Sequence, residues 1–463
     1  MPMPFLNETP HVKRRFKMKL FGTDGIRGKA NTYPITPELA LLVGKAVAKE
    51  CEASGHGSRR AVLGKDTRLS GYMLENAISA GLLSMGMDVL EVGPMPTPAV
   101  AHLTRSLCAD CGIMITASHN PAEDNGIKIF DRCGFKLSDA ETSAIEQSIA
   151  DETLSSSHIA NAQIGKARRI DDARGRYIEF AKSTIKNRSL AGLKVVLDCA
   201  NGAAYSMAPS IFRELGAEVI AVSTEPNGQN INLDCGALHP ENLSRLVRQY
   251  RADAGIALDG DADRVIFSDA EGVIVDGDRI IGMVALDYKK RNRLAGGAVV
   301  VTSMSNLGLH KAMKEAGIGV ITTDVGDHKV IEAMRERSCN LGGEQSGHII
   351  FMDHVTTGDG IITALHVLKL MKENDTTLRK CADFMTAFPQ QMVNLPVREK
   401  IPLEELREVQ ALIKEVEALG SARAIVRYSG TENKMRILVE APERETVETW
   451  IGRIREAALK QLG

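Results

Sequence analysis

Residues 112–121 read Gly-Ile-Met-Ile-Thr-Ala-Ser-His-Asn-Pro, which predicts a strand followed by a loop, and similar stretches recur along much of the chain. The apolar run at 112–115 is typical of a buried strand, and Asn120-Pro121 is a turn signal that ends any regular element. We therefore expect Ser118 on a tight loop at the exposed end of the strand. Adjacent side chains on extended backbone point to opposite faces, which argues against His119 acting as the general base for Ser118, as in serine proteases. This stretch alone leaves Ser118 as either a nucleophile or an ordinary loop serine.

Similar apolar runs occur throughout the chain, and each ends in a loop of small or polar residues. Examples lie at residues 61–63, 194–197 and 298–301, and they alternate with segments of helical period. This alternation predicts repeated βα units whose ligand-binding loops follow the carboxyl ends of the strands.

The C-terminal part has a different pattern. Two strand-like runs, 424–426 and 435–439, are followed by an apolar stripe at spacings of three and four residues. The stripe predicts one helix packed on a small antiparallel sheet, with its apolar residues in the core. Its members are Val447, Trp450, Ile451, Ile454, Ala458 and Leu462.

An acidic loop follows the apolar run 255–258. Asp259, Asp261 and Asp263 alternate with small residues, a spacing that can place oxygen ligands around one Mg²⁺ ion, with a phosphate oxygen as a further ligand. An EF-hand calcium loop would need glycine and glutamate where Arg264 and Ala270 stand, so calcium is not expected. A solvated acidic turn is the remaining alternative.

The segment between the two C-terminal strand runs has the composition of a phosphate cradle. Arg427 offers a fork-shaped guanidinium, Ser429 and Thr431 offer hydroxyls, and Gly430 lets backbone N–H groups approach closely. A polar hairpin turn explains the same residues equally well when they are taken alone.

Taken together, these motifs resemble the α-D-phosphohexomutase family, from about Phe21 to the C-terminus, and most closely its phosphoglucosamine mutase branch. The strings that carry the resemblance are 21–28 (FGTDGIRG), 93–100 (GPMPTPAV), 227–232 (NGQNIN) with Cys235-Gly236, and 343–348 (GEQSGH).

The resemblance implies an α/β fold of three similar α/β domains with mixed sheets around a central cleft, plus a smaller C-terminal α+β domain. The expected domains cover residues 17–170, 171–272, 273–388 and 389–463, after an N-terminal extension at 1–16.

The resemblance also implies a mechanism in which Ser118 carries a phosphoryl group. Phospho-Ser118 would donate to a sugar hydroxyl, and the resulting bisphosphate would turn over and return its other phosphate to Ser118. One Mg²⁺ per subunit would be held by Asp259, Asp261 and Asp263 with a phosphoserine oxygen of Ser118. Glucosamine 1,6-bisphosphate or a similar compound would be the intermediate and activator.

Further roles follow from the family motifs. Lys128, in the string Asn125-Gly126-Ile127-Lys128, is implied in proton transfer, and we expect burial and Arg27 to lower its pKa. His119 is the rival for this role and is expected to orient groups by hydrogen bonding. Arg27 and Arg264 are expected to stabilise the transferring phosphoryl group.

Substrate choice would rest on Glu344 and Ser346, which in the family reach sugar hydroxyls O3 and O4. The implied reaction interconverts glucosamine 6-phosphate and glucosamine 1-phosphate for UDP-N-acetylglucosamine and cell-wall synthesis. The chain departs from the branch at 326–329, where Gly-Asp-His-Lys replaces Gly-Asp-Arg-Tyr, so His328 or Lys329 would have to replace an arginine contact. A phosphomannomutase or phosphoglucomutase, and a non-catalytic phosphosugar-binding protein, are the alternatives.

The composition fits a cytoplasmic enzyme with a small-molecule phosphosugar partner. The 57 basic and 59 acidic residues give a formal charge of −2, which indicates neither a nucleic-acid nor a membrane partner. Residues 1–9 lack the apolar core of a signal peptide, and no stretch approaches the ~20 apolar residues of a membrane span. The eight cysteines lack metal-site spacing and are expected as reduced, mostly buried thiols. The resemblance also admits a homodimer.

Overall fold

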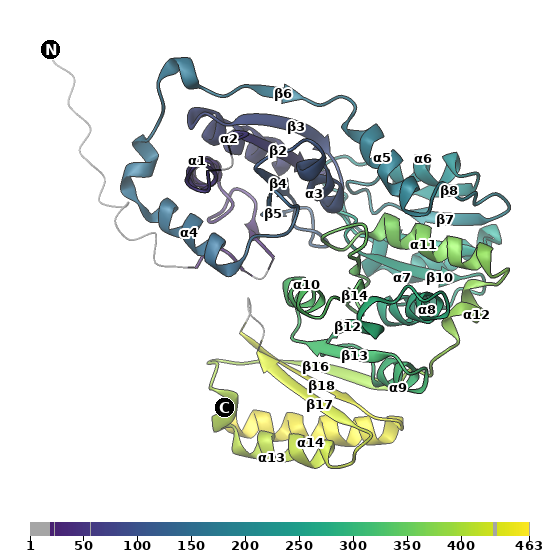
Figure 1. The fold of residues 1–463 in the computed structure, drawn as a ribbon. Coiled ribbons are helices and arrows are strands. Elements are labelled where there is room, and N and C mark those ends of the chain that lie inside the picture. Colours follow the sequence, from purple (N-terminus) through teal and green to yellow (C-terminus); the bar gives the residue numbers. More distant parts are fainter. Residues whose placement is uncertain (1–18, 23, 56, 429–432, 463) are drawn as a thin grey trace. The chain divides into compact units, whose positions relative to one another are not determined.

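The computed structural model describes residues 19–462, except for residues 23, 56 and 429–432 (Figure 1). These residues form two compact units. The first unit comprises the chain up to Met304 together with Ile318–Ala382, and the second comprises Ser305–Gly317 together with Asp383–Gly463. Each unit is described separately below.

The first unit begins with a mixed sheet in the strand order β1-β5-β4-β2-β3-β6. Strands β4, β2, β3 and β6 run parallel, whereas β5 is antiparallel to both β4 and β1. All residues of β4 are buried, which agrees with its continuous apolar sequence. The strands are β1 (Ile26–Lys29), β2 (Arg60–Lys65), β3 (Asp88–Pro94), β4 (Cys111–Ile115), β5 (Asp124–Asp131) and β6 (Ala167–Arg169).

Helices join the strands of this sheet, as parallel pairing requires. Thr36 accepts the Leu39 N–H at the start of α1, and Pro37 occupies the first turn. Ser138 and Glu141 form a capping box at the start of α4. The helices are α1 (Pro37–Ala53), α2 (Ser70–Ser84), α3 (Thr97–Ser106) and α4 (Asp139–Ala150).

The second sheet of this unit has the order β11-β10-β9-β7-β8, with β8, β7 and β9 parallel and β10 and β11 antiparallel to their neighbours. Its strands are β7 (Lys194–Asp198), β8 (Glu218–Val222), β9 (Ala254–Leu258), β10 (Val265–Asp269) and β11 (Ile274–Val275). The accompanying helices are α5 (Ala173–Thr184), α6 (Met207–Glu214) and α7 (Pro240–Tyr250).

The third sheet has the order β13-β12-β14-β15, in which only β15 is antiparallel to its neighbour. Its strands are β12 (Ala298–Thr302), β13 (Gly319–Thr323), β14 (Leu341–Gly343) and β15 (Ile349–Phe351). The helices of this part of the first unit are α8 (Gly277–Lys290), α10 (Asp327–Glu336), α11 (Gly360–Glu373) and α12 (Leu378–Ala382).

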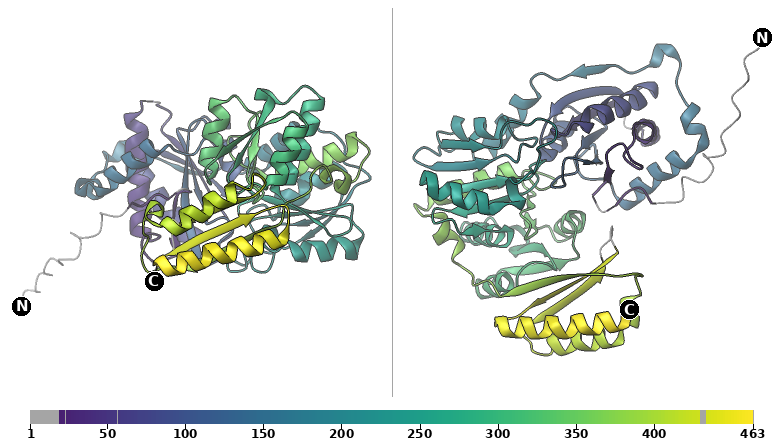
Figure 2. Two further views of the ribbon diagram at one scale, coloured as in Figure 1. Left: turned by 90° about the horizontal axis from the view of Figure 1, so that it is seen from below. Right: turned by 180° about the vertical axis from the view of Figure 1, so that it is seen from behind.

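The second unit is built on an antiparallel sheet in the order β16-β18-β17. Helices α13 and α14 lie together on one face of this sheet (Figure 2). The predicted stripe of α14 is the core: Val447, Ile451, Ile454 and Ala458 are buried, and Trp450 and Leu462 pack against them. The elements are α9 (Leu307–Glu315), β16 (Gln390–Pro396), α13 (Arg407–Glu417), β17 (Arg423–Tyr428), β18 (Lys434–Glu440) and α14 (Arg444–Leu462).

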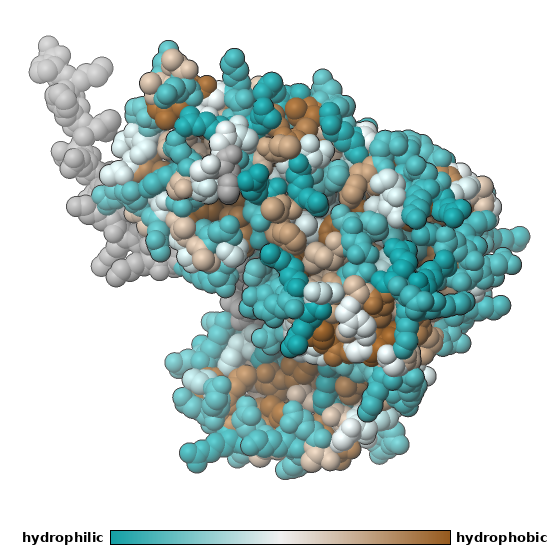
Figure 3. Space-filling view, in the orientation of Figure 1, coloured by the Kyte–Doolittle hydropathy of each residue, from teal (hydrophilic) through white to brown (hydrophobic). Residues whose placement is uncertain are grey.

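The α/β class, the mixed sheets and the smaller C-terminal part with an antiparallel sheet are confirmed. The residue boundaries of the domains stay predictions, and the extension at 1–16 lies outside the described residues. All eight cysteines are free, and Cys111, Cys199, Cys235 and Cys339 are buried. Within the described part of the chain, no helix is long and apolar enough to span a membrane. Hydrophilic residues cover most of the face shown in Figure 3.

Candidate active site

Ser118 lies on the loop after β4, where the sequence placed it. The expectation of an exposed position is wrong, because the acidic loop packs against this serine: its side chain is buried, and Oγ donates a hydrogen bond of 2.7 Å to Asp259 Oδ2. Its φ of 53° lies in the left-handed region, not in the extended region. The expectation that Ser118 and His119 point apart is therefore wrong: Ser118 Oγ lies 3.3 Å from His119 Nδ1, because the left-handed residue turns the two side chains to the same side.

The acidic loop follows β9, and its three carboxylates lie together. Asp259, Asp261 and Asp263 are buried and offer ligand oxygens within 4.8 Å of one another. The Oδ1 atoms of Asp261 and Asp263 are buried without a hydrogen-bond partner, a costly arrangement unless a cation binds there. These residues fit a hard divalent cation, since such ions take carboxylate oxygens as ligands.

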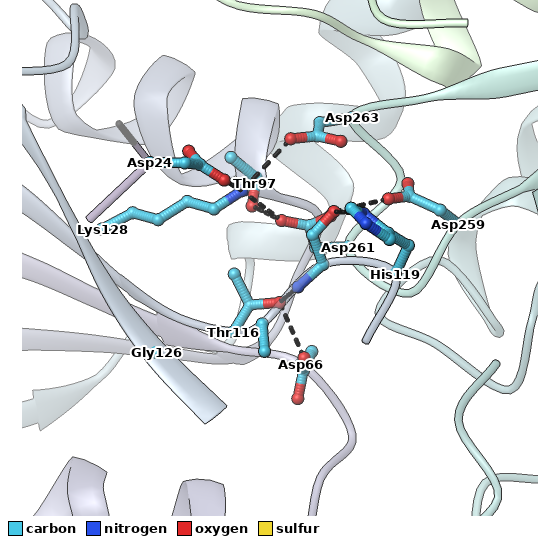
Figure 4. A network of polar contacts seen from close by, with 12 residues as sticks. Asp24, Asp66, Thr97, Thr116, His119, Gly126, Lys128, Asp259, Asp261 and Asp263 are labelled. Carbon is cyan, nitrogen blue, oxygen red and sulfur yellow. Dashed lines mark hydrogen bonds and ion pairs between the residues drawn. The ribbon is translucent and has the colours of Figure 1, made fainter. Parts of the chain in front are cut away.

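Lys128, from β5, points into this acidic group (Figure 4). Its Nζ lies 2.8 Å from Asp261 Oδ2, 3.2 Å from Asp263 Oδ2 and 3.4 Å from Asp24 Oδ2. Burial lowers the pKa of Lys128, but the three carboxylates outweigh burial and raise this pKa well above its ordinary value. The expectation of a lowered pKa is therefore wrong, because Arg27 and burial act against three negative charges and not one.

Burial and the charge of Lys128 shift the pKa values of Asp259 and Asp263 in opposite directions. Burial, Asp263 and Asp261 raise the pKa of Asp259 well above its ordinary value. Burial also acts on Asp263, but the ammonium of Lys128 outweighs it and holds the pKa of Asp263 well below the ordinary value. The site therefore favours the protonated form of Asp259 and the ionised form of Asp263.

Two arginines flank the serine loop. Arg27 bonds to the Asp24 carboxylate and lies 3.4 Å from the carbonyl oxygen of Ala117. Arg264 lies 4.0 Å from Asp263 Oδ1, and its Nε is buried without a hydrogen-bond partner. Burial and the nearby arginines lower the pKa of His119 to about 4, so this imidazole is neutral at pH 7.

Glu344 and Ser346 follow β14 in the same unit. Glu344 Oε1 accepts the Gly326 N–H at 3.2 Å, and Ser346 Oγ lies 3.4 Å from Glu344 Oε2. The departing segment 326–329 opens α10, and its residues Gly326, His328 and Lys329 line a cavity of about 230 Å³ together with Lys128 and Lys136.

Arg427 lies on β17 in the second unit, directly across from Arg436 of β18. Two guanidinium groups at one register position give this end of the sheet a positive charge suited to an anion. Ser429, Gly430 and Thr431, the other predicted members of the phosphate cradle, lie outside the described residues.

The structure adds residues that the sequence reasoning did not assign to the site. Thr97 Oγ1 donates to Asp261 Oδ2 at 2.5 Å, and Lys136 binds both Asp24 and Asp327. His348 Nδ1 lies 3.7 Å from Asp263 Oδ2, and its Nε2 accepts the Gly358 N–H, which leaves the proton on Nδ1 facing the carboxylate. Asp24, Thr97 and His348 belong to the sequence strings that carry the family resemblance, so the sequence could have pointed to them. Lys136 belongs to none of these strings.

The sequence of this chain is similar to those of known sugar-phosphate mutases. The chain matches the phosphoglucomutase/phosphomannomutase family over its alpha/beta/alpha domains I (residues 18–156), II (175–272) and III (276–388) and its C-terminal domain (392–457). A phosphoglucosamine mutase of Citrifermentans bemidjiense is 51% identical over 448 residues, which cover 96% of this chain and 98% of that protein.

Solved structures share the fold. A phosphoglucomutase/phosphomannomutase family protein from Burkholderia thailandensis superposes with a TM-score of 0.81 at 24% identity, covering 95% of this chain and 97% of its own. The N-acetylphosphoglucosamine mutase of Aspergillus fumigatus, solved with GlcNAc-6P and magnesium, gives 0.64 at 18% identity and covers 96% of each chain.

The chain belongs to the phosphoglucomutase/phosphomannomutase family, the α-D-phosphohexomutases. It is an enzyme of the isomerase class that transfers a phosphoryl group within a hexose phosphate.

Proposed function

We propose that this enzyme is a phosphoglucosamine mutase, which interconverts glucosamine 6-phosphate and glucosamine 1-phosphate. The observation that carries the proposal is the contact between Ser118 Oγ and Asp259 Oδ2, which puts a nucleophilic hydroxyl beside a buried group of carboxylates. The 51% identity to a phosphoglucosamine mutase over nearly the full chain supports the amino sugar as the substrate.

In the proposed reaction, phospho-Ser118 gives its phosphoryl group to the free O1 or O6 hydroxyl of the sugar. The sugar hydroxyl loses its proton, and Ser118 Oγ gains one. The bisphosphate, glucosamine 1,6-bisphosphate, then turns over, and its other phosphoryl group returns to Ser118. Phosphoryl transfer depends mainly on positioning and charge neutralisation.

The residues around Ser118 fit these roles. Lys128 is a buried cation, so it is suited to neutralise charge, whereas its raised pKa makes it a weak proton donor. His119 is neutral at pH 7 and lies within reach of Ser118 Oγ, so it is suited to exchange a proton there. Arg27 and Arg264 would stabilise the transferring group.

The three aspartates with Ser118 would hold one Mg²⁺, and the unpartnered oxygens of Asp261 and Asp263 support this assignment. When bound, Mg²⁺ would neutralise part of the negative charge of the phosphoryl group. Glu344 and Ser346 would bind sugar hydroxyls. Arg427 with Ser429, Gly430 and Thr431 would bind the phosphate that does not react.

The proposal is tested by intact mass spectrometry and a kinetic assay. Incubation with glucosamine 1,6-bisphosphate should add one phosphoryl mass to the wild type, and the phosphorylated enzyme should turn over glucosamine 6-phosphate with a higher kcat/KM than glucose or mannose 6-phosphate. The margin can be modest, since nothing in the proposed roles dedicates a partner to the C2 substituent. A preference for mannose or glucose 6-phosphate would favour the alternative mutases, and phosphosugar binding without turnover would favour a binding protein.

We also propose a cytoplasmic location and a homodimer, which the resemblance admits. Light scattering of the purified enzyme tests the dimer, and cell fractionation tests the location.

A further inference from the structure

The backbone of Ser118 is held from both sides by buried polar groups. Its N–H donates to Thr116 Oγ1 at 2.9 Å. Its carbonyl oxygen accepts two hydrogen bonds, one of 2.9 Å from Asn232 Nδ2 and one of 3.1 Å from Arg68 Nη2. A serine in the left-handed region persists only where its surroundings fix it, and these bonds do so.

Arg68 follows β2, a strand of the same sheet as β4, which precedes Ser118. Its guanidinium is fully buried, is paired with Asp66 at 2.8 Å, and also donates to the carbonyl oxygens of Asn120 and Asp124. Thr116 Oγ1 in turn donates to Asp66. This network belongs to the core, and a substitution of Arg68 would leave several buried carbonyls without a donor.

Asn232 reaches the serine loop from the part of the chain that carries the acidic loop. Its amide nitrogen donates both to Ser118 O and, at 3.1 Å, to Asn120 O, while its own N–H is anchored on Ala200 O. Gly228, in the same NGQNIN string, accepts the Leu69 N–H at 2.9 Å. The NGQNIN string is thus joined to the serine loop by the hydrogen bonds of Asn232.

The acidic loop packs against the same point. A Cβ at Gly260 would lie 2.5 Å from Ser118 O and 2.8 Å from Asn232 Nδ2, so only glycine fits between the two aspartates Asp259 and Asp261. The Ser118 carbonyl, the Asn232 amide and the Gly260 backbone are therefore in close contact. The position of Ser118 Oγ relative to the carboxylates depends on this contact.

We propose that Asn232 is a positioning residue for the phosphoryl transfer: its amide holds the Ser118 loop at a fixed distance from the acidic loop. This inference rests on the proposed function. A displacement of about 1 Å at a reacting group can reduce a rate by roughly 100-fold, so loss of the amide should slow transfer without weakening the groups that bind the sugar.

The test compares Asn232→Asp and Asn232→Gly with the wild type. Both variants tolerate the left-handed backbone at this residue, whose φ is 59°. Asp keeps the shape of the side chain, but it offers at most one donor as an acid and none as a carboxylate. Thr67→Val is the matched control, because Thr67 Oγ1 donates a hydrogen bond of 2.6 Å to Asn201 O across the same junction and is not one of the donors that hold the Ser118 carbonyl.

We expect both Asn232 variants to lose kcat by roughly 10- to 100-fold, with the KM for glucosamine 6-phosphate within about twofold of wild type. The single-turnover rate of Ser118 phosphorylation by glucosamine 1,6-bisphosphate, followed by intact mass at pH 8, should fall by the same factor. The Thr67→Val enzyme should match the wild type in both measurements, and the thermal midpoints of all variants should stay close together.

A near-normal phosphorylation rate in Asn232→Asp would overturn the inference, since a residue that only fills space would tolerate this isosteric change. An equal loss in Thr67→Val would overturn it too, because the effect would then belong to the whole junction. If the wild type itself is not phosphorylated, the proposed function fails, which distinguishes the two failures.

Discussion

Ser118 and Ser138 give a direct contrast between a chemical and a structural serine. Ser118→Ala removes the hydroxyl that bonds Asp259, so mutase turnover should fall by roughly 10³-fold or more while the thermal midpoint changes little. Ser138→Ala removes the N-cap of α4 and should lower the free energy of unfolding by about 1 kcal/mol without changing kcat. Mutase assays and thermal denaturation of both variants check this. Normal turnover by Ser118→Ala would exclude a phosphoserine mechanism.

Asp261 is the residue at which metal binding can be tested apart from folding. Asp261→Asn keeps the shape of the side chain but removes one negative charge, so the affinity for Mg²⁺ should fall by roughly 10-fold or more, and excess Mg²⁺ should restore part of the rate. Isothermal titration with Mg²⁺ and the metal dependence of kcat measure this. Asp198→Asn is the control, since the buried Asp198 carboxylate bonds the N–H groups of Ala200 and Gly236 and should affect stability alone. Activity after complete removal of metal would contradict the assignment.

The residue types of the site could be predicted from the sequence, but their charge states could not. Ser118 and the three aspartates were found because small residues and apolar runs around them have a distinctive spacing. The left-handed φ of Ser118 could not be predicted, since it is fixed by hydrogen bonds with Thr116, Arg68 and Asn232 that exist only in the folded chain. The raised pKa of Lys128 depends in part on Asp24, which reaches it from the turn before β1 in a tertiary contact.

Among the elements, α11 begins at a carboxyl group that makes stability depend on pH. Asp359 caps this helix by accepting the Ile362 N–H and also accepts the Tyr177 hydroxyl at 2.7 Å. Burial raises its pKa to about 6. A raised folded-state pKa means that the native protein binds the proton more tightly, so this group contributes stability at pH 4 that is lost as the pH rises through 6.

Asp359→Asn should therefore gain stability relative to wild type as the pH rises from 4 to 7, by roughly 2–3 kcal/mol. Asn still caps the helix and cannot titrate. Urea denaturation at both pH values measures the difference. Asp151→Asn should show a pH dependence of the opposite sign, so that the variant loses stability relative to wild type as the pH rises. Hydrogen bonds from Thr153 lower the pKa of Asp151, and wild-type Asp151 therefore contributes stability above its unfolded pKa. A variant-minus-wild-type difference that does not change with pH would show that Asp359 does not titrate in this range.

At the scale of elements, apolar runs in the sequence predict the central strands of the sheets but not the strands at their edges. β4, β7 and β12 are continuous buried runs that the sequence marks clearly. β1 and β11 are short, and nothing in their composition shows that they pair antiparallel with β5 and β10. Pairing of edge strands is decided by loop geometry and by neighbours far along the chain.

At the scale of the molecule, the second unit is assembled from two separated parts of the chain. The segment of α9 bonds to the C-terminal part: the Leu307 N–H donates to Glu440 Oε1 at 2.7 Å, and the Phe388 N–H donates to Asn306 Oδ1 at 2.8 Å. The sequence predicted a separate C-terminal domain from a change of pattern, but α9 has the same helical period as its neighbours. Its membership of this unit is therefore a tertiary property that sequence periodicity does not contain.

Two units with separate cores should unfold separately, and the chain carries a natural probe for one of them. Trp450 is the only tryptophan of the sequence and packs against the core of the second unit. Ile454→Ala, in that core, should lower the urea midpoint seen by tryptophan fluorescence through a loss of about 2–5 kcal/mol. Ile281→Ala, equally buried in α8 of the first unit, should instead shift the main far-ultraviolet circular dichroism transition and leave the fluorescence midpoint in place. Since a single cooperative core would move both signals together in both variants, coincident shifts would show that the two units unfold as one.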